Sequence, residues 1–205
     1  MAGSPVPHPR SVSRPLQPAP CERILEAALA VAEDRGWTAV RPSEVARSLG
    51  LEPRDVLACY RDLDSMADAW FLRGWQAMLA ERGPGFYDRP ARERVETVML
   101  AWFDAFAHRR RVTVEMIRAK LHPSHAHHWV PMVFNLSRTI HWLREAAALP
   151  AAYGSPRAQL EEVGLTALFL ATLAVWAGDD SPGQLRTRHF LADRLEGADR
   201  LLARL

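Results

Sequence analysis

Hydrophobic residues recur at helical spacing along most of the chain after residue 21. In the first such segment Ile24, Leu25, Ala28 and Leu29 share one face, and charged residues occupy the other. Gly36 ends this helix, because glycine readily adopts the positive φ of a helix C′ position. No segment alternates with period two over a convincing length, so we expect an all-α protein. The predicted helices span about 22–35, 42–49, 53–60, 62–82, 89–108, 110–121, 128–148, 156–177 and 182–204.

The first four predicted helices form a recognisable motif. Pro42 and Ser43 open a short helix, Gly50 makes a turn, and Pro53 opens a second short helix that ends near Tyr60. Two short helices joined by a glycine-containing turn and packed on a preceding helix are typical of a helix-turn-helix DNA-binding domain. The sequence therefore predicts three parts: a tail at 1–21, a three-helix head with a linking helix at 22–82, and a helical body at 83–205.

The tail is rich in proline. Residues 1–20 hold six of the fifteen prolines and no acidic residue. Such a segment buries too little apolar surface to offset its ordering entropy, so we expect it to be disordered. Arg10 and Arg14 could reach DNA as a basic arm, and an inert solvated tail is the simpler interpretation of only two arginines.

The head is acidic, although the whole chain has a formal charge of +2. Between residues 22 and 82 there are eight arginines, no lysine and eleven Asp and Glu, a net charge of −3. This balance is unfavourable for a domain that binds phosphate groups. Arg41, Arg47, Arg54 and Arg61 remain as candidates for contacts with phosphates or guanines. The alternative is that they are solvated partners of acidic side chains.

The run ILEAALAVAEDRGWTAVRPSEVARSLGL, at 24–51, resembles the opening of the TetR family of one-component transcriptional regulators. It has the family's apolar first helix, the Gly36-Trp37 step and the turn glycine Gly50. The resemblance implies a homodimer whose head binds a palindromic operator and whose body binds a small effector that changes the spacing of the heads. Helix three departs from the family pattern, with Asp55 in the base-contacting position. The expected DNA-binding residues are Arg41, Ser43, Arg47, Pro53, Arg54, Asp55, Tyr60 and Arg61.

The stretch WAGDDSPGQLRTRHFLADRLEGAD, at 176–199, is similar to the last helices of TetR-like lipid-binding accessory proteins of ubiquinone biosynthesis. The shared elements include Asp180-Ser181-Pro182, Thr187 and Phe190-Leu191. Those proteins keep the helix-turn-helix shape without a DNA-binding surface, which would account for the acidic head. Two functions are therefore expected: a TetR-type regulator, acting as a repressor that senses an apolar small molecule, or alternatively a lipid- or isoprenoid-binding accessory protein without a DNA role.

The body is dense in aromatic side chains and methionines. These residue types line hydrophobic ligand cavities between helices, and adaptable Met beside flat aromatics suits a flexible apolar ligand. For any single residue, plain core packing is the more common role. The candidate pocket residues are Trp102, Phe106, Met116, Trp129, Met132, Phe134, His141, Trp142, Phe169 and Trp176.

The predicted helix at 156–177 is apolar nearly all round, and such a helix must be buried on every face. With the helix at 182–204 it suits a four-helix seam in a homodimer, the alternative being packing within one chain. Its uncharged stretch, 163–178, is shorter than the roughly 20 residues of a membrane span, so we expect a buried helix, no membrane span and a cytoplasmic protein. The candidate interface residues are Leu165, Leu168, Thr172, Phe190, Leu191 and Leu195.

Other chemistry has little support in the sequence. Cys21 and Cys59 have no partner at metal-binding spacing and are predicted to be reduced thiols of a cytosolic protein. His125 and His128 could share a helix face and bind zinc, but no Asp, Glu or Cys completes the cluster at 122–128, and solvated histidines are favoured over a metal site. No nucleophile–base pair or phosphate loop is present at recognisable spacing, so neither an enzyme nor a cofactor is predicted.

Overall fold

The computed structural model describes residues 20–121 and 129–202, and within these ranges the secondary structure is entirely helical. This confirms the predicted all-α fold. The helix ends agree with the sequence pattern to within a few residues, except that the last predicted helix begins as a 3₁₀ turn. The α-helices are α1 (Pro20–Arg35), α2 (Pro42–Ser48), α3 (Pro53–Cys59), α4 (Leu63–Ala80), α5 (Ala91–Phe106), α6 (Arg110–Leu121), α7 (Trp129–Ala146), α8 (Pro156–Trp176) and α9 (Leu185–Leu202), with short 3₁₀ turns η1 (Trp37–Ala39), η2 (Phe86–Asp88), η3 (Ala107–Arg109) and η5 (Pro182–Gln184).

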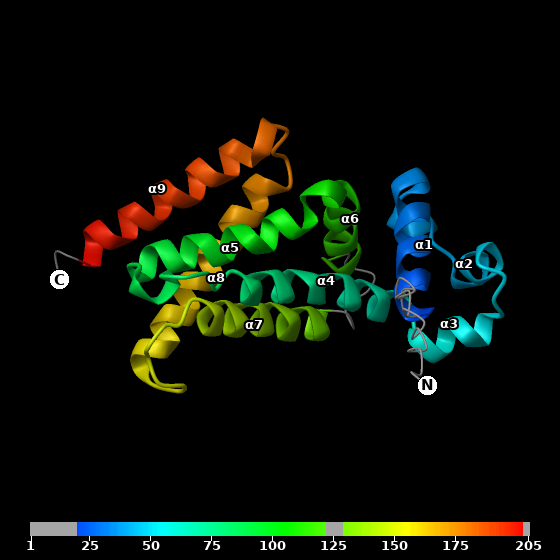
Figure 1. The fold of residues 1–205 in the computed structure, drawn as a ribbon, viewed down its shortest axis with the longest axis horizontal. Helices are drawn as coiled ribbons and strands as arrows, with labels where there is room; N and C mark the ends of the chain where they lie inside the picture. The colour runs from blue at the N-terminus through cyan, green and yellow to red at the C-terminus, as the bar shows by residue number, and fades with distance from the viewer. Residues whose placement is uncertain (1–19, 122–128, 203–205) are drawn as a thin grey trace, which may run out of the picture.

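The helices form a small head and a larger body. In Figure 1, α1, α2 and α3 lie together at one end of the molecule, and α4 runs from them into the body between α5 and α7. The body is completed by α6 beside the head, by α8 across the bundle and by α9 along its outer side. Because α4 packs against helices of both parts, it connects the head directly to the body core.

Local sequence signals explain where these helices begin and turn. Pro42, Pro53 and Pro156 each occupy the first turn of a helix, where the missing N–H has no partner to lose. Asp62 caps α4, because its Oδ1 accepts a 2.7 Å hydrogen bond from the backbone N–H of Ser65. Gly36 has φ +86°, the conformation expected from its place at the end of α1.

Aromatic rings fill the centre of the body. Trp102 of α5 packs edge-on against Phe106 and against Phe169 of α8, at centroid distances of 4.7 and 5.0 Å. Trp176, the last residue of α8, extends the cluster by packing against Phe103. Edge-to-face pairs of this kind add to the energy of apolar burial. The core therefore lies between α4, α5 and α8.

Helix α8 is buried on only one side within the chain. Only 22% of its most apolar 18-residue window is buried within the chain, and Leu160 and Val163 are 70% and 68% exposed. One side of the helix packs on α7 and α9, and no described segment covers the other side. Within a single chain α8 is therefore not buried on every face, and the predicted homodimer seam would have to cover its exposed side. By length and composition alone α8 could also cross a membrane, a test that apolar helices of soluble bundles pass as well.

Candidate functional site

The third helix of the head is short and lightly packed. Val56 is its only residue buried in the head core. Immediately after it, Tyr60 points inward, and its hydroxyl donates a 2.9 Å hydrogen bond to the backbone carbonyl of Cys21 on α1. Burial, together with the negative charge of Glu22, raises the pKa of Tyr60. Tyr60 therefore holds α3 in place, and its side chain does not face outward.

Cys21 and Cys59 form a disulfide between the start of α1 and the end of α3. The prediction of two reduced thiols is wrong. The residues are 38 apart in sequence, yet their Cα atoms are only 5.3 Å apart because α3 folds back across α1. The bond is a second anchor for α3 on the same side as Tyr60.

Four exposed arginines surround the helix-turn-helix, and they differ in their partners. Arg41 lies at the N-cap position of α2, and its guanidinium donates to the backbone carbonyls of Thr38 and Val40 at 2.9 and 3.1 Å. Arg61 pairs with Asp62 at 2.9 Å, and this hydrogen bond raises the pKa of the guanidinium. The remaining two, Arg47 and Arg54, make no hydrogen bond or ion pair with the described residues. They are the cations most available to an external partner.

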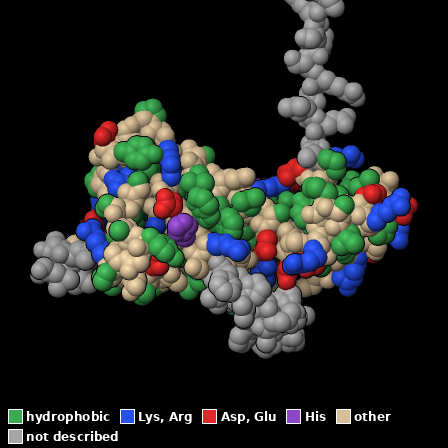
Figure 2. Space-filling model, turned by 90° about the horizontal axis from the view of Figure 1, so that it is seen from below, with side chains coloured by type: hydrophobic (Ala, Val, Ile, Leu, Met, Phe, Trp, Pro, Cys, Tyr) green, Lys and Arg blue, Asp and Glu red, His purple; other side chains and the backbone are tan. Residues whose placement is uncertain are grey.

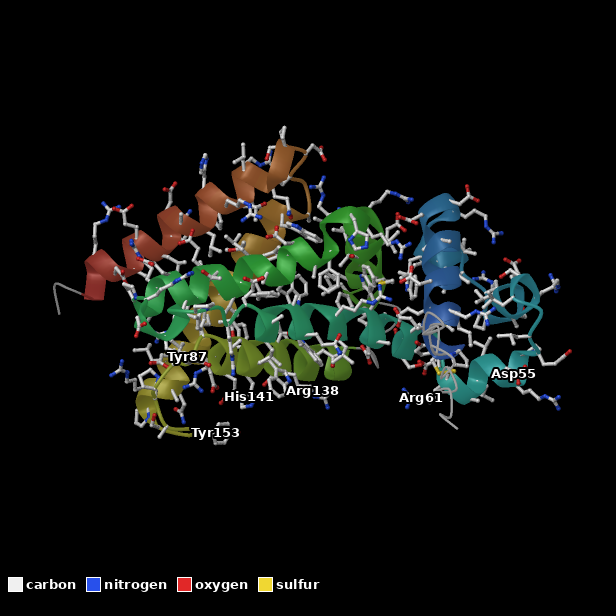
Figure 3. The ribbon with its side chains drawn as sticks, viewed as in Figure 1. Asp55, Arg61, Tyr87, Arg138, His141 and Tyr153 are labelled. Atoms are coloured by element: carbon white, nitrogen blue, oxygen red, sulfur yellow. A yellow bond between two sulfur atoms is a disulfide. The ribbon has the colours of Figure 1, made fainter. Side chains whose placement is uncertain are left out.

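The acidic residue at the start of α3 has a structural role. The carboxylate of Asp55 accepts a 2.9 Å hydrogen bond from the backbone N–H of Glu52, which caps the helix. Asp55 and Arg61 mark the two ends of α3 in Figure 3. Over the face of the head seen in Figure 2, basic and acidic side chains are interspersed. This face of the head is therefore mixed in charge.

Charged groups join the head to α6 and to the turn that precedes it. Arg109 pairs with Glu26 and Glu33 of α1 at 2.6 and 3.2 Å. Burial alone would raise the pKa of Glu26, but hydrogen bonds from Arg109 and Arg73 hold that pKa below its usual value. Glu115 of α6 accepts a 2.7 Å hydrogen bond from the backbone N–H of Trp37 in the head. A shift of α6 would thus act directly on α1 and η1.

The body contains an apolar cavity of about 310 Å³ where five helices meet. This volume is at the lower end of the range for small-molecule sites. A single charged side chain, Lys120, is part of the wall, and Trp102 lies on the α5 side. The lining residues are Phe71, Trp75, Trp102, Ile117, Lys120, Leu121, Asn135, Leu136, Thr139, Phe169, Leu170 and Leu173.

A second hollow lies between α7 and α8 on the outside of the body, with a volume of about 530 Å³. Its wall includes Arg138, Glu162 and Thr166 and is more polar than that of the first cavity. His141 and Tyr153 stand perpendicular across it with their rings 6.3 Å apart, and Figure 3 shows both below α7 on the same side as Arg138. The inner, apolar cavity is the better match to an apolar ligand.

Comparison with known proteins identifies the family. The crystal structure of the TetR transcriptional regulator from Nitrosomonas europaea is 35% identical to this chain, covers 87% of it and 97% of its own length, and has a TM-score of 0.76. This chain belongs to the TetR family of transcriptional regulators. A bacterial regulatory protein in the tetR family from Rhodococcus RHA1 has the same general fold, with 22% identity, a TM-score of 0.50, and coverage of 88% of this chain and 97% of its own. No family model and no curated protein matches the chain.

For a TetR-family head, the expected DNA-binding residues have distinct environments. Ser43 and Pro53 lie in the first turns of α2 and α3, and both are exposed. Arg47 and Arg54 make no hydrogen bond or ion pair with the described residues, Asp55 completes the capping box of α3, and Tyr60 is internal. The chain thus places two unpaired arginines on the α2 and α3 surface.

The expected pocket residues are also divided. Trp102 and Phe169 line the inner cavity, whereas Phe106, Met116 and Trp176 are fully buried in the surrounding core. His141 borders the outer hollow, and Trp142 is 38% exposed. The side chains of Trp129, Met132 and Phe134 lie outside the described residues, as does the histidine cluster at 122–128. Among the described residues no group of three or more His, Cys, Asp and Glu side chains could hold a metal.

Sequence reasoning misses the part of the cavity wall that comes from α4. Phe71 and Trp75 belong to the segment 22–82, which the sequence assigns to the head. The helix is 18 residues long, roughly 27 Å, which is long enough to reach well beyond the head. Its length is the signal that could place these two residues in the body.

The expected interface residues lie mostly on the inner side of their helices. Leu165, Thr172, Leu191 and Leu195 are buried within the chain, while Leu168 and Phe190 are partly exposed. The outward face of α8 is formed by other residues. It carries a stripe of apolar and small side chains: Leu160, Val163, Gly164, Ala167, Ala171 and Ala174.

Proposed function

We propose that this TetR-family protein is a homodimeric, DNA-binding transcriptional repressor of the cytoplasm that responds to an apolar small molecule. The observation that carries the proposal is that α6 takes part in both sites. Ile117 and Lys120 of α6 line the cavity, and Glu115, less than one turn away from Ile117, holds the backbone of Trp37 in the head. A ligand that displaces α6 changes the position of the head.

In this proposal α3 enters the major groove, as the second helix of a helix-turn-helix does. Arg47 and Arg54 supply the contacts with phosphates or guanines, because their guanidinium groups are exposed and without described partners. Two such contacts per head, on a domain of net charge −3, favour modest affinity. Binding to a palindrome by two heads then provides the remaining stability of the complex.

The dimer forms through the outward stripe of α8 defined above. Its residues recur mostly every three or four positions, so they share one helix face, and that face is largely uncovered in the single chain. Gly164 and three alanines within the stripe allow the partner helix to approach closely. An isologous pairing of the two α8 helices would bury this face and fix the distance between the heads.

Repression follows if the ligand-free dimer holds the heads at the operator spacing. A ligand in the cavity separates α4 from α6, because both helices contribute to its wall. The ion pairs of Arg109 with Glu26 and Glu33 transmit this movement to α1. Ligand binding therefore lowers operator affinity only to the extent that the ligand prefers the displaced state.

Fluorescence anisotropy with a duplex from the upstream region of the protein's own gene tests the DNA role. Arg54→Ala and Arg47→Ala should each weaken the complex and reduce its salt dependence, with a slope smaller by about 1 for each phosphate that is no longer neutralised. Arg200→Ala is the matched control, since Arg200 lies near the end of α9 and pairs with Glu196 of its own helix. An Arg200→Ala effect equal to that of Arg54→Ala would place the DNA surface elsewhere.

The acidic head favours a second candidate, a lipid-binding accessory protein of the same fold without a DNA role. The head has a net charge of −3, and Asp62 neutralises Arg61, one of its four helix-turn-helix arginines. Such a surface is poorly suited to binding phosphates. This candidate replaces the first if the wild type forms no complex with its upstream DNA at low salt and lipid co-purifies with the protein in a denaturing mass spectrum.

A further inference from the structure

The Cys21–Cys59 disulfide cross-links the proposed recognition helix to the first helix of the head. Cys59 is the last residue of α3, and Cys21 is the second residue of α1. In Figure 1 one end of α3 meets the lower end of α1. The proposed DNA role gives this bond no function beyond anchoring α3.

Few other contacts hold α3 on the head. Val56 is its only residue buried in the core, and Leu57 is 63% exposed. At the end of the helix, the remaining anchor is the hydrogen bond from the hydroxyl of Tyr60 to the backbone carbonyl of Cys21. Segments with so little buried apolar surface are the first to open locally. Breaking the disulfide would therefore leave α3 detached from α1 for part of the time.

The bond lies close to the protein surface. Both cysteines are half-buried, and their neighbours Glu22 and Ala58 are exposed. Small thiols can therefore reach this part of the head, and access is one of the factors that decide whether a disulfide exchanges. Disulfides are rare in the cytoplasm, the compartment proposed for this protein, and those that form there usually have catalytic or redox-sensing roles.

Thiol–disulfide exchange with a low-molecular-weight thiol would open the bond in two steps. The thiolate of one small molecule attacks one cysteine sulfur, breaks the S–S bond and forms a mixed disulfide, while the other cysteine leaves as a thiolate and takes up a proton. A second small thiolate attacks the mixed disulfide and releases the first cysteine, which is protonated in turn. The protein gains two electrons, and the two small thiols are oxidised to one disulfide. Oxidation of the head is the reverse reaction.

We propose that Cys21 and Cys59 form a redox site that controls DNA binding, with low-molecular-weight thiols and their disulfides as its reactants. The disulfide form holds α3 in place for the operator, and reduction releases α3 and lowers operator affinity. The inference rests on the proposed DNA role of α3 and adds an input that is separate from the apolar ligand of the body.

The size of the effect depends on how often reduced α3 stays in place. The apparent affinity of a head falls in proportion to the fraction of its binding-competent state. A palindrome needs two competent heads at once, so the fractions multiply. If each reduced head keeps α3 in place for about one third of the time, operator affinity falls about tenfold.

Fluorescence anisotropy with the upstream duplex of the protein's own gene tests the proposal at low salt. The full chain is titrated after equilibration with oxidised glutathione and again with reduced glutathione. The reduced wild type should bind about tenfold more weakly than the oxidised wild type, and reoxidation should restore the affinity.

Cys21→Ser and Cys59→Ser are matched variants, because they remove the same bond from two different helices. Both should bind like the reduced wild type, whichever form of glutathione is present. Cys21→Ser also keeps the backbone carbonyl that accepts from Tyr60. A variant that still responds to glutathione would place the redox site elsewhere and overturn the proposal.

Amide hydrogen exchange shows whether the change is local. Reduction should speed exchange in α3, while the amides of the buried residues Leu25 and Leu29 of α1 remain protected. An equal increase in α1 and α3 would mean that the whole head unfolds, and unchanged exchange in α3 would mean that the helix is not released. Either result overturns the proposal.

The titration separates this proposal from the DNA role on which it rests. Equal affinity in the two forms, or tighter binding by the reduced form, overturns the redox control and leaves the DNA role standing. If neither form of the wild type binds the duplex at low salt, the DNA role fails and the redox control of it fails as well.

Discussion

The indole ring of Trp102 lies directly against the backbone of Gly74, where α4 and α5 pack together beside the cavity. A Cβ atom at residue 74 would be only 2.6 Å from Nε1 and Cδ1 of Trp102 and 2.7 Å from Cε2 of Phe106. Real Cβ atoms do not approach other atoms so closely, and both rings are fixed in the core. A glycine is therefore required at this helical position by its neighbours, although its φ is ordinary.

Gly74→Ala should destabilise the protein by about 1–3 kcal/mol, the usual cost of overpacking a core. Alanine is the better helix former by up to about 1 kcal/mol, so the steric cost is partly masked. Gly197→Ala is the matched control: Gly197 is exposed on α9 with nothing within 4 Å of its added Cβ, and the change should stabilise slightly. Urea unfolding measures both, and destabilisation of equal size would refute the close contact.

The disulfide predicts a redox-dependent stability of the head. The disulfide closes a loop of 38 residues. If its stabilisation comes from chain entropy, breaking it should lower the free energy of unfolding by about 4 kcal/mol. Cys59→Ser should therefore lower urea resistance, and a reducing agent should do the same to the wild type and nothing further to the variant. Ala58→Ser, at the exposed neighbouring position, controls for the new hydroxyl. A reductant effect that persists in Cys59→Ser would contradict the assigned bond.

The buried carboxylate of Asp179 predicts a loss of stability in acid. Burial alone would raise its pKa, but the hydroxyls and backbone N–H groups of Ser181 and Thr187 donate to it at 2.5–3.0 Å and hold the pKa far below the usual value. Because the folded pKa is depressed, the stabilisation is complete well above pH 4 and is lost as the pH falls toward the folded pKa.

Asp179→Asn should destabilise by about 1–3 kcal/mol at neutral pH, the cost of disrupting a buried hydrogen-bonded group, and should lose less further stability than the wild type between about pH 5 and pH 3. Asp180→Asn is the control, since its side chain is 93% exposed and its ion pair with Arg110 lies at the surface. Thermal unfolding across this pH range provides the comparison. Parallel acid curves for wild type and Asp179→Asn would be inconsistent with the depressed pKa.

The exposed apolar stripe of α8 predicts that one charged side chain placed in it will disrupt the dimer. Val163→Glu should convert dimers to monomers, because a carboxylate would be buried unpaired within the proposed seam. Leu185→Glu, at a half-exposed position at the start of α9, should leave the dimer intact. Light scattering distinguishes the two masses. If the wild type is already monomeric, or if Val163→Glu remains a dimer, α8 does not form the proposed interface.

Periodicity and turn residues are sufficient to predict the helices, because those signals are local. The apolar spacing after Glu22 and the glycines at 36 and 50 predict the boundaries of the head helices to within a few residues. Contacts between distant segments are not predictable in this way. Nothing near Cys21 or Cys59 indicates that the end of α3 returns to the start of α1.

The cavity and the interface show the same limit. The apolar stripe of α4 indicates that Trp75 is packed, but a stripe does not say against which part of the fold it packs. Similarly, the apolar surface of α8 indicates that every face should be covered, without distinguishing the chain's own core from a partner. Lys120 gives no signal in the sequence, because a single charge at the end of a helix usually lies in water.

The proposed repressor needs Arg47 and Arg54 to make the head a DNA-binding domain. The most direct test is the anisotropy titration of the wild type against its own upstream duplex at several salt concentrations. A DNA-binding head should form a complex at low salt that weakens steeply as salt is added, with a shallower slope for Arg54→Ala. An absence of binding at low salt, or binding with no salt dependence, would contradict it.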